Sequence, residues 1–360
     1  MGSLDEFYMR RALDLALKRK GLTHPNPTVG CVIVKDGKIV GEGFHYKAGY
    51  DHAEVVALKQ AGEKAKGATV YVTLEPCAHY GRTPPCSLAL IRAGVKRVVI
   101  ATTDPNPRVA GKGISMLKNA GIEVSVGVLE KEAKKLNEDF FHWIVNKTPF
   151  VVLKIAQTLD GFIATKKGLS KWITSTESRK EVHSLRCQSD AILVGVSTVI
   201  KDDPQLTVRH IPCEKKPLRV VLDTHLRIPL EAKILDTKEA PTLIFTASDN
   251  REKINLLIQK GVEVVKVPTK EGKLDLKEVL HKLGEREILQ LLVEGGSKVF
   301  GSFLKEGLAN KLVVFVAPKV FGQGIPPFGG IQIEDPSEAL KFKLDTLKRL
   351  GEDIYMEFYP

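Results

Sequence analysis

The 360-residue sequence contains only five cysteines, four methionines and two tryptophans, and it has no long run of apolar residues. A helix that crosses a membrane needs about 20 consecutive apolar residues, so a helical membrane protein is excluded. The first residues, MGSLDEFYMRRALDLALKRKG, place acidic side chains early and have the spacing of an amphipathic helix, which differs from the pattern of a signal peptide. We therefore expect a cytoplasmic protein.

The cysteines are too few and too widely spaced to form a disulfide framework in a chain of this length. Cys31 lies in an apolar run and is expected to be buried. Cys187 and Cys213 have no candidate metal ligands beside them in the sequence. Because free cysteines are commonly buried, we expect both to be buried free thiols. Cys77 and Cys86 remain as candidates for chemistry.

The chain carries a formal net charge of +11, yet it has no basic arm or block. Lysine and arginine are spread among aspartate and glutamate along the whole length. A basic protein can bind nucleic acid. The dispersed pattern instead favours a solvated surface of mixed charges, with local sites that attract phosphorylated small molecules.

Apolar residues recur with helical spacing in some segments and in short runs or alternation in others. In the first part of the chain, this pattern predicts helices over residues 6–20, 52–64, 87–94, 113–120 and 129–145, and strands over residues 28–35, 38–45, 68–74, 97–102 and 122–126. In the second part, it predicts strands over residues 150–156, 191–195, 218–222, 241–246, 262–267, 288–294 and 311–317, and helices over residues 251–260, 276–283 and 298–306. Such mixtures indicate layered α/β domains. Lys147-Thr148-Pro149 is the predicted boundary between domains of residues 1–147 and 148–360.

The most informative motif consists of three candidate zinc ligands and a nearby acid: His52, Cys77, Cys86 and Glu54. One imidazole and two thiolates leave a fourth position on Zn²⁺ for water, as in catalytic zinc sites. Glu54, two residues after the histidine, can accept and return a proton of that water. His-x-Glu followed by Pro-Cys and a second Cys is the signature of zinc-dependent deamination of cytosine-like or adenine-like rings. A structural zinc site with His79 as the fourth ligand is the less favoured alternative.

Eight residues separate Cys77 from Cys86, whereas deaminases that act on nucleic acids usually have two at this point. The insert contains His79 and Arg82 on a segment with two prolines. A guanidinium group can bind a phosphate through two hydrogen bonds. The insert therefore favours a phosphorylated small molecule over a polynucleotide as substrate.

Four segments together resemble the deaminase half of the bifunctional riboflavin-biosynthesis deaminase/reductase family: His24-Pro25-Asn26-Pro27-x-Val29-Gly30, His52-Ala53-Glu54, the segment from Pro76 to Cys86, and Asp104-Pro105-Asn106-Pro107. The resemblance implies a cytidine-deaminase-like three-layer fold. It also implies a substrate with a diaminopyrimidinone ring on a ribosyl 5-phosphate. The residues that would bind this substrate are Asn26, His45, His79, Arg82, Asp104 and Asn106.

Segments of the second half resemble the reductase half of the same family, whose fold is similar to that of dihydrofolate reductase: Lys154–Gly161, Lys171–Ser175, His183–Arg186, Gly195–Val199, Asp202–Arg209 and Leu292–Ser297. The last of these is a glycine-containing turn from a strand into a helix, where backbone N–H groups can bind a diphosphate. The resemblance implies reduction of the ribosyl group to a ribityl chain with NADPH. The implied cofactor residues are Ala156, Trp172, Thr198, Asp202, Thr224, Gly296, Ser297, Lys298, Val299, Phe300, Gly301 and Ser302. The implied substrate residues are Ser170, Arg186, Leu206, Arg209 and Glu294.

The sequence thus predicts a bifunctional enzyme of riboflavin biosynthesis, with a zinc-dependent hydrolase in residues 1–147 and an NADPH-dependent oxidoreductase in residues 148–360. We expect small pyrimidine ribosyl phosphates as ligands, no nucleic-acid or membrane partner, and a homo-oligomer formed through the reductase domain. Two alternatives stay open. One is a transfer-RNA or other nucleic-acid deaminase with an accessory ligand-binding domain. The other is a second half that binds a ligand or regulates without catalysing a reduction.

Overall fold

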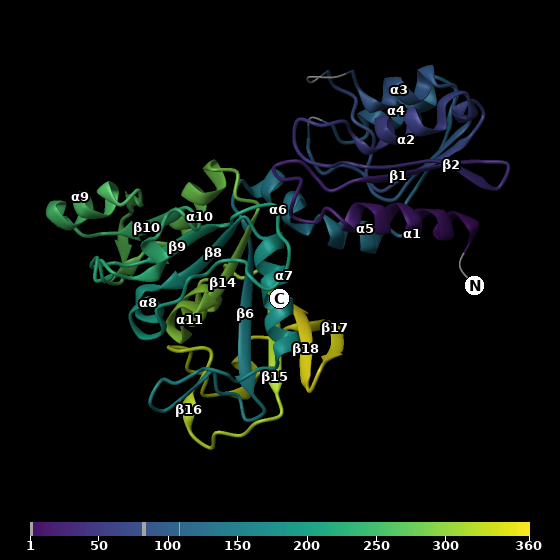
Figure 1. The fold of residues 1–360 in the computed structure, drawn as a ribbon. Helices are drawn as coiled ribbons and strands as arrows, with labels where there is room; N and C mark the ends of the chain where they lie inside the picture. Colours follow the sequence, from purple (N-terminus) through teal and green to yellow (C-terminus); the bar gives the residue numbers. More distant parts are fainter. Residues whose placement is uncertain (1–2, 81–83, 108) are drawn as a thin grey trace. The chain divides into compact units, whose positions relative to one another are not determined.

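The computed structural model describes residues 3–80, 84–107 and 109–360. The chain divides into two compact units, Met1–Lys147 and Thr148–Pro360, and each is built around its own sheet (Figure 1). Within these described ranges, no helix is both long enough and apolar enough to cross a membrane.

The sheet of the first unit has five strands, which are β1 (Gly30–Lys35), β2 (Lys38–Phe44), β3 (Thr69–Val72), β4 (Arg97–Ile100) and β5 (Glu123–Val126). Their order in the sheet is β2-β1-β3-β4-β5. β1 runs antiparallel to β2 and β3, whereas β3, β4 and β5 are parallel. Asp36 and Gly37, both with positive φ, form the hairpin turn between β1 and β2.

Helices cover both faces of this sheet. Because side chains alternate along β1, Cys31 and Ile33 share a core with residues of α2 (Ala53–Ala61), α3 (Cys86–Arg92) and α4 (Lys112–Asn119). Val32 and Val34 point to the other face and share a core with residues of α1 (Leu4–Leu17) and α5 (Glu130–Leu136). The unit is therefore the three-layer α/β sandwich that the resemblance implied.

The single helix predicted over residues 129–145 is instead two helices, α5 and α6 (Glu138–Asn146). They meet at Asn137, whose side chain is buried. Its Oδ1 accepts a hydrogen bond from the Thr28 backbone N–H at 2.7 Å, and its Nδ2 donates to the Thr28 carbonyl at 2.8 Å. Helical periodicity carries no information about a hydrogen bond to a segment so far away in the sequence. The sequence pattern therefore predicts one continuous helix.

The second unit contains a nine-stranded sheet with the order β11-β10-β9-β8-β14-β6-β15-β18-β17. The strands are β6 (Phe150–Thr158), β8 (Ala191–Gly195), β9 (Leu218–Leu222), β10 (Thr242–Thr246), β11 (Glu263–Lys266), β14 (Gln290–Gly295), β15 (Lys311–Ala317), β17 (Lys343–Leu350) and β18 (Asp353–Tyr359). The seven strands from β11 to β15 in this order are parallel to one another. β18 runs antiparallel to β15, and β17 runs antiparallel to β18. Two small sheets pair β7 (Ala164–Thr165) with β16 (Gly324–Ile325) and β12 (Thr269–Lys270) with β13 (Lys273–Leu274).

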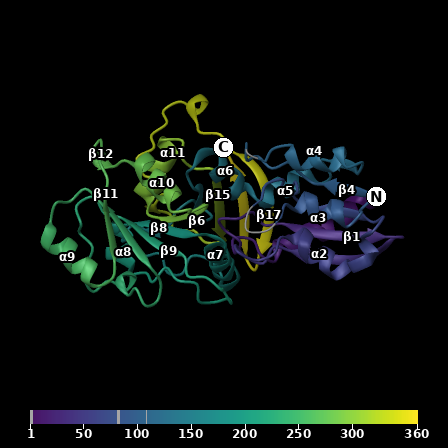
Figure 2. The same cartoon turned by 90° about the horizontal axis from the view of Figure 1, so that it is seen from above.

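Helices also cover both faces of the larger sheet. Leu193 shares a core with residues of α10 (Leu276–Glu285) and α11 (Ser297–Lys305). Ile192, its neighbour, points the other way and shares a core with residues of α8 (Val196–Asp202) and α9 (Arg251–Gln259). In Figure 2, α10 and α11 lie on one side of the strands and α8 on the other.

Several elements of the second unit, including α8 and β18, have no counterpart in the sequence prediction, and two further ones show why. Helix α7 (Thr176–Gln188) is rich in polar and charged residues, so its apolar stripe is too weak to stand out. Strand β17 is largely exposed, without the apolar alternation of a half-buried strand. Neither element has a strong local pattern: α7 is defined by its packing on the sheet, and β17 by its pairing with β18.

The expectation that Cys187 and Cys213 are free thiols is wrong, because the two form a disulfide bond. Cys187 is near the end of α7, and Cys213 is 26 residues further along the chain. The pairing depends on a loop that returns to the end of the helix, which local sequence does not reveal. Cys31, Cys77 and Cys86 are free.

Candidate active sites

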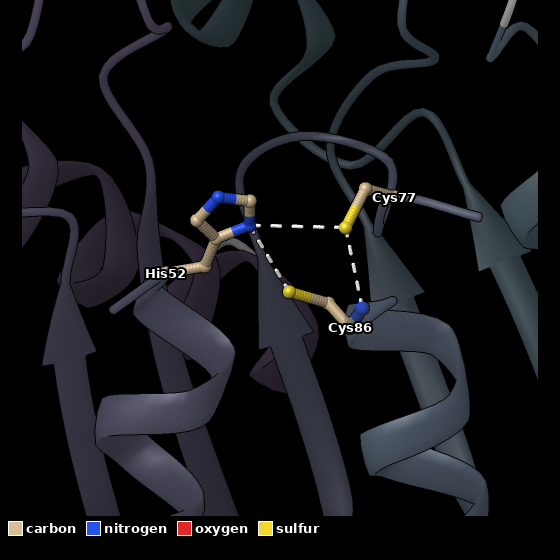
Figure 3. A group of neighbouring side chains, drawn as sticks. All are labelled: His52, Cys77 and Cys86. Carbon is tan, nitrogen blue, oxygen red and sulfur yellow. Dashed lines mark hydrogen bonds between the residues drawn. The ribbon is translucent and has the colours of Figure 1, made fainter. Parts of the chain in front are cut away.

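The three predicted metal ligands converge at one end of the first sheet. His52 precedes the first residue of α2, Cys77 follows β3, and Cys86 is the first residue of α3. Their ligand atoms all lie within 4.8 Å of one another. The Nδ1 atom of His52 is 3.2 Å from Cys86 Sγ and 3.7 Å from Cys77 Sγ (Figure 3).

The chemistry of these donors fits Zn²⁺. The Cys86 backbone N–H donates to Cys77 Sγ at 3.2 Å. Hydrogen bonding from the Cys86 thiol and from His52 holds the pKa of Cys77 well below its usual range, so this group is readily a thiolate ligand. One nitrogen and two sulfur donors match a catalytic zinc site in which the fourth position takes water.

Glu54 lies in the first turn of α2 and is only 4% exposed. Burial raises its pKa to about 7, and the negative charge of Cys77 adds to the rise. A carboxyl group whose pKa lies near neutrality can both take up and release a proton. Its place beside the three ligands is the place that the sequence motif predicts for the proton carrier.

Two of the predicted substrate residues are connected to the metal ligands: His45 contacts His52, and Asn26 contacts His45. The ring of His45 meets the ring of His52 edge-on, with centroids 5.4 Å apart. His45 Nδ1 is 3.0 Å from the carbonyl oxygen of Asp51, so Nδ1 carries the proton. His45 Nε2 therefore accepts from the amide group of Asn26, at 3.1 Å.

Two buried contacts hold the backbone segment that carries Asn26. One is the pairing of Asn137 with Thr28 described above. The other is a 3.0 Å contact between His24 Nε2 and Asp139 Oδ2, both of which are buried. The sequence motif contains the segment of Asn26 but not Asn137 and Asp139, because these two residues lie more than 100 residues further along the chain.

Asp104 and Asn106 lie on the loop that follows β4. The Asn106 backbone N–H donates to Asp104 Oδ1 at 2.8 Å. Burial raises the pKa of Asp104, and the charges of Glu75, His79 and Cys77 also act on it. The loop is therefore close to the metal ligands. His79 is exposed, and Arg82 lies outside the described residues.

A buried cluster of three charged groups forms the centre of the second unit. Glu294, on β14, accepts two hydrogen bonds from Arg186 of α7, at 2.6 and 2.9 Å. Lys154 Nζ of β6 is 3.4 Å from the same carboxylate. Burial alone would raise the pKa of Glu294, but the two positive charges outweigh it and lower the pKa to about 2. The sequence predicted Arg186 and Glu294 but assigned no role to Lys154.

The loop after α8 carries Leu206 and Arg209 and is fastened to α7. Arg186 Nη1 donates to the Thr207 carbonyl at 3.0 Å, and the Arg209 backbone N–H donates to His183 Nδ1 at 3.2 Å. Leu206 is 4% exposed, whereas Arg209 reaches the surface. Ser170 is half-buried, and no contact brings it to the charged cluster among the residues described.

Four of the predicted cofactor residues lie where parallel strands end: Ala156 on β6, Thr198 after β8, Thr224 after β9 and Gly296 after β14. Ligands of open α/β sheets bind outside these carboxyl ends. A Cβ atom on Gly296 would lie 3.3 Å from Thr198 Oγ1, so the first turn of α8 touches the start of α11. Asp202 ends α8, and burial raises its pKa.

The remaining cofactor residues differ in exposure. Trp172 is 64% exposed, and the Arg179 guanidinium lies 4.5 Å from its ring centroid. Along α11, Lys298 is exposed whereas Phe300 is 2% exposed and belongs to the core. A Cβ atom on Gly301 would lie 2.0 Å from a backbone oxygen. Only part of the segment from Gly296 to Ser302 can therefore face a ligand through side chains.

Residues 3–102 match the cytidine and deoxycytidylate deaminase zinc-binding region, and residues 149–356 match the RibD C-terminal domain. Riboflavin biosynthesis protein RibD of Aquifex aeolicus (strain VF5) is 58% identical over 355 residues, with 99% of this chain and 98% of that protein covered. RibD of Escherichia coli (strain K12) is 44% identical, with 97% and 98% covered. The solved structure of Acinetobacter baumannii RibD, form 1, has a TM-score of 0.88 at 45% identity and covers 99% of this chain and 98% of that one.

The fold and the two sites define a zinc-binding deaminase joined to a reductase. The chain belongs to the RibD family of riboflavin biosynthesis proteins. It is a bifunctional enzyme of riboflavin biosynthesis, a hydrolase and an oxidoreductase that use Zn²⁺ and NADPH. Because the relatives match along both domains, the comparisons favour this function over that of a nucleic-acid deaminase.

Proposed function

We propose that residues 1–147 hydrolytically deaminate 2,5-diamino-6-(5-phosphoribosylamino)pyrimidin-4-one, and that residues 148–360 then reduce its ribosyl side chain to ribityl with NADPH. A solved structure from Thermotoga maritima, 42% identical with a TM-score of 0.88, is named as a diaminohydroxyphosphoribosylaminopyrimidine deaminase and 5-amino-6-(5-phosphoribosylamino)uracil reductase. The observation that carries the proposal is the convergence of three zinc donors beside a buried carboxyl group.

The roles in the first unit follow from this arrangement. His52, Cys77 and Cys86 hold the zinc ion, which when bound makes its water a nucleophile at neutral pH. Glu54 would carry one proton of the attacking water to the ring nitrogen, and then the proton of the newly formed hydroxyl group to the amino group, which leaves as ammonia. Asn26 offers a donor and an acceptor to the pyrimidine edge, and neutral His45 fixes its orientation.

The ribosyl phosphate is assigned to the rim of this site. His79 and Arg82 on the insert would bind the phosphate. Asp104 and Asn106 would bind polar groups of the substrate. The half-buried position of Asp104 and the action of the Cys77 charge on it support a place close to the metal ligands.

In the second unit, the charged cluster and the strand ends would hold the two reactants. Arg186 and Arg209 supply positive charge for the sugar phosphate, with Ser170, Leu206 and Glu294 completing its surroundings. NADPH would lie along the strand ends, against Ala156, Trp172, Thr198, Asp202, Thr224 and the start of α11. The contact between Thr198 in α8 and Gly296 before α11 supports a shared ligand surface there.

The Glu54→Gln variant tests the order of the two reactions. Given the diamino substrate, it should release no ammonia and oxidise no NADPH, because the reductase receives no deaminated pyrimidine. Given the deaminated pyrimidine, it should oxidise NADPH as the wild type does. Zinc content serves as the control and should stay at the wild-type level. Ammonia release at the wild-type rate would contradict the role of Glu54.

We also propose that the enzyme is cytoplasmic, that it acts on free small molecules rather than nucleic acid, and that it forms a homo-oligomer through the second unit. The edge strand β17 exposes Leu344 and Leu347, which are 47% and 62% exposed, and a second copy could cover them. Light scattering of the wild type and of a Leu344→Glu, Leu347→Glu variant tests this. A mass equal to one chain for the wild type would contradict self-association.

A further inference from the structure

Glu75 occupies a buried position between two parts of the deaminase site. It lies just after β3, two residues before the metal ligand Cys77, and is 4% exposed. Its backbone N–H donates to the Thr102 carbonyl at 3.0 Å. Its carboxylate accepts four hydrogen bonds from backbone N–H groups, all of which belong to a different segment of the chain.

The four donors bracket the loop that carries Asp104 and Asn106. Glu75 Oε2 accepts from Asp104 N at 3.2 Å and from Gly111 N at 3.1 Å. Glu75 Oε1 accepts from two N–H groups in the first turn of α4, Gly113 N at 3.0 Å and Ile114 N at 3.3 Å. One carboxylate thus holds both ends of residues 104–111.

Close packing also holds the start of α4 against the segment that carries Cys77. A Cβ atom on Gly113 would lie 1.9 Å from the Pro76 carbonyl oxygen, so the start of α4 touches the backbone directly before Cys77. The negative charge of Glu75 at this helix start is also favourable, because the helix dipole places positive charge there. The metal-ligand segment and the loop of Asp104 are therefore joined by charge and by contact.

We infer that Glu75 is a positioning residue of the deaminase, which holds Asp104 and Asn106 in register with Cys77 so that they can bind the substrate. The inference rests on the proposed substrate role of these two residues. Glu75 is not a catalytic residue: a carboxylate has about four acceptor sites, and its four bonds to backbone N–H groups use them.

The Glu75→Gln variant removes the charge and leaves one acceptor oxygen, so the new NH₂ group faces two N–H donors. The loop should lose its register, and the KM of deamination should rise about tenfold with a smaller change in kcat, since a misplaced binding group weakens substrate binding. Zinc content and NADPH oxidation by the second unit should be unchanged. Amide hydrogen exchange should accelerate in residues 104–114 and not in α2. Glu75→Asp, which keeps the charge, should restore part of the KM and is the variant to use if Glu75→Gln does not fold.

A matched control is Asp5→Asn in the same unit. Asp5 also accepts hydrogen bonds, two from Arg97 at 2.9 and 2.8 Å and one from Tyr71 Oη at 2.9 Å. Arg97 begins β4, however, whereas Cys77 follows the other end of the parallel strand β3. This variant should lower the stability of the unit and leave the KM of deamination unchanged. An equal rise in KM in Asp5→Asn would show that general destabilisation explains the effect, and would overturn the inference.

A double-variant cycle with Asn106→Ala separates the inference from the proposed function. If Glu75 acts through the loop, the double variant should have the KM of Asn106→Ala alone. Additive effects, an unchanged KM in Glu75→Gln, or loss of zinc from it would overturn the inference and leave the proposed function standing. An unchanged KM in Asn106→Ala would instead contradict the proposed substrate role, and the inference would fall with it.

Discussion

Three buried glutamates of this chain show how surroundings decide what a carboxyl group does. Glu54 has few compensating partners, and burial raises its pKa to about 7, which suits proton transfer. Glu294 faces two cations, and its pKa falls to about 2, so it remains charged. Glu75 accepts four backbone hydrogen bonds and serves the architecture of the loop.

The sequence predicted the residues of the zinc motif, because few residue types can bind zinc. A histidine, two cysteines and a glutamate at these spacings are rare unless they bind zinc, and the structure brings the three ligands together. The sequence did not reveal the supporting partners Lys154, Glu75 and Asp139. Such partners are defined by contacts between distant segments, and nothing in the local sequence distinguishes them from the many Lys, Glu and Asp residues of the surface.

Glu294→Gln tests the charged cluster. The variant leaves Arg186 and Lys154 buried without their counter-charge, so the second unit should lose about 3–5 kcal/mol of stability at pH 7. In the folded wild type the pKa of Glu294 is about 2, whereas a glutamate in an unfolded chain has a pKa of ~4.3. The carboxylate therefore stabilises the fold fully at pH values above the unfolded pKa. This stabilisation is lost as the pH falls towards the folded pKa. The difference between variant and wild type should therefore shrink as the pH falls towards 2. Urea unfolding at several pH values measures it.

Glu181→Gln is the control for this experiment. Glu181 lies on α7 and forms an ion pair with Lys348 at 3.5 Å, in which both side chains are partly exposed. Such a pair contributes at most about 1 kcal/mol. An equal loss of stability in both variants would contradict a special role for the buried cluster.

At the scale of elements, short apolar runs predicted the central strands of both sheets, because helices bury these strands on both faces. Cys31 and Ile33 face one layer of the first unit, and Val32 faces the other. The prediction failed where an element depends on distant partners. The Asn137 break, the polar helix α7 and the exposed strand β17 all depend on contacts that no local window contains.

The disulfide joins the end of α7 to the segment that follows the loop of Leu206 and Arg209. Because the proposed function places the sugar phosphate against this loop, loss of the bond should affect both stability and the reductase. A loop of 26 residues corresponds to about 3.5 kcal/mol by the chain-entropy relation. Under reducing conditions, the second unit should unfold at lower urea, and the KM for the deaminated pyrimidine should rise because the loop of Arg209 is less restrained. Deamination should not change.

The Cys187→Ser, Cys213→Ser variant provides the control. It should behave like the reduced wild type and should not respond to added dithiol. Thiol titration of the unfolded oxidised wild type should detect Cys31, Cys77 and Cys86 but not the pair. Detection of all five thiols without reductant would contradict the bond.

At the scale of the whole molecule, the chain contains two units with separate sheets and separate chemistry. Zinc removal should therefore affect only one of them. A chelator strong enough to strip the site should abolish ammonia release and leave NADPH oxidation with the deaminated pyrimidine intact. Added Zn²⁺ should restore ammonia release. Loss of both activities on chelation would contradict the independence of the two sites.

Mass spectrometry of the products shows whether one chain carries out both reactions in sequence. The diaminopyrimidinone ribosyl phosphate is incubated with the enzyme, first without and then with NADPH. Without NADPH the product should be heavier by about one mass unit, as an amino group is replaced by oxygen. With NADPH it should gain about two more, from a hydride and a proton. A pyrimidine whose mass is unchanged under both conditions would contradict the account.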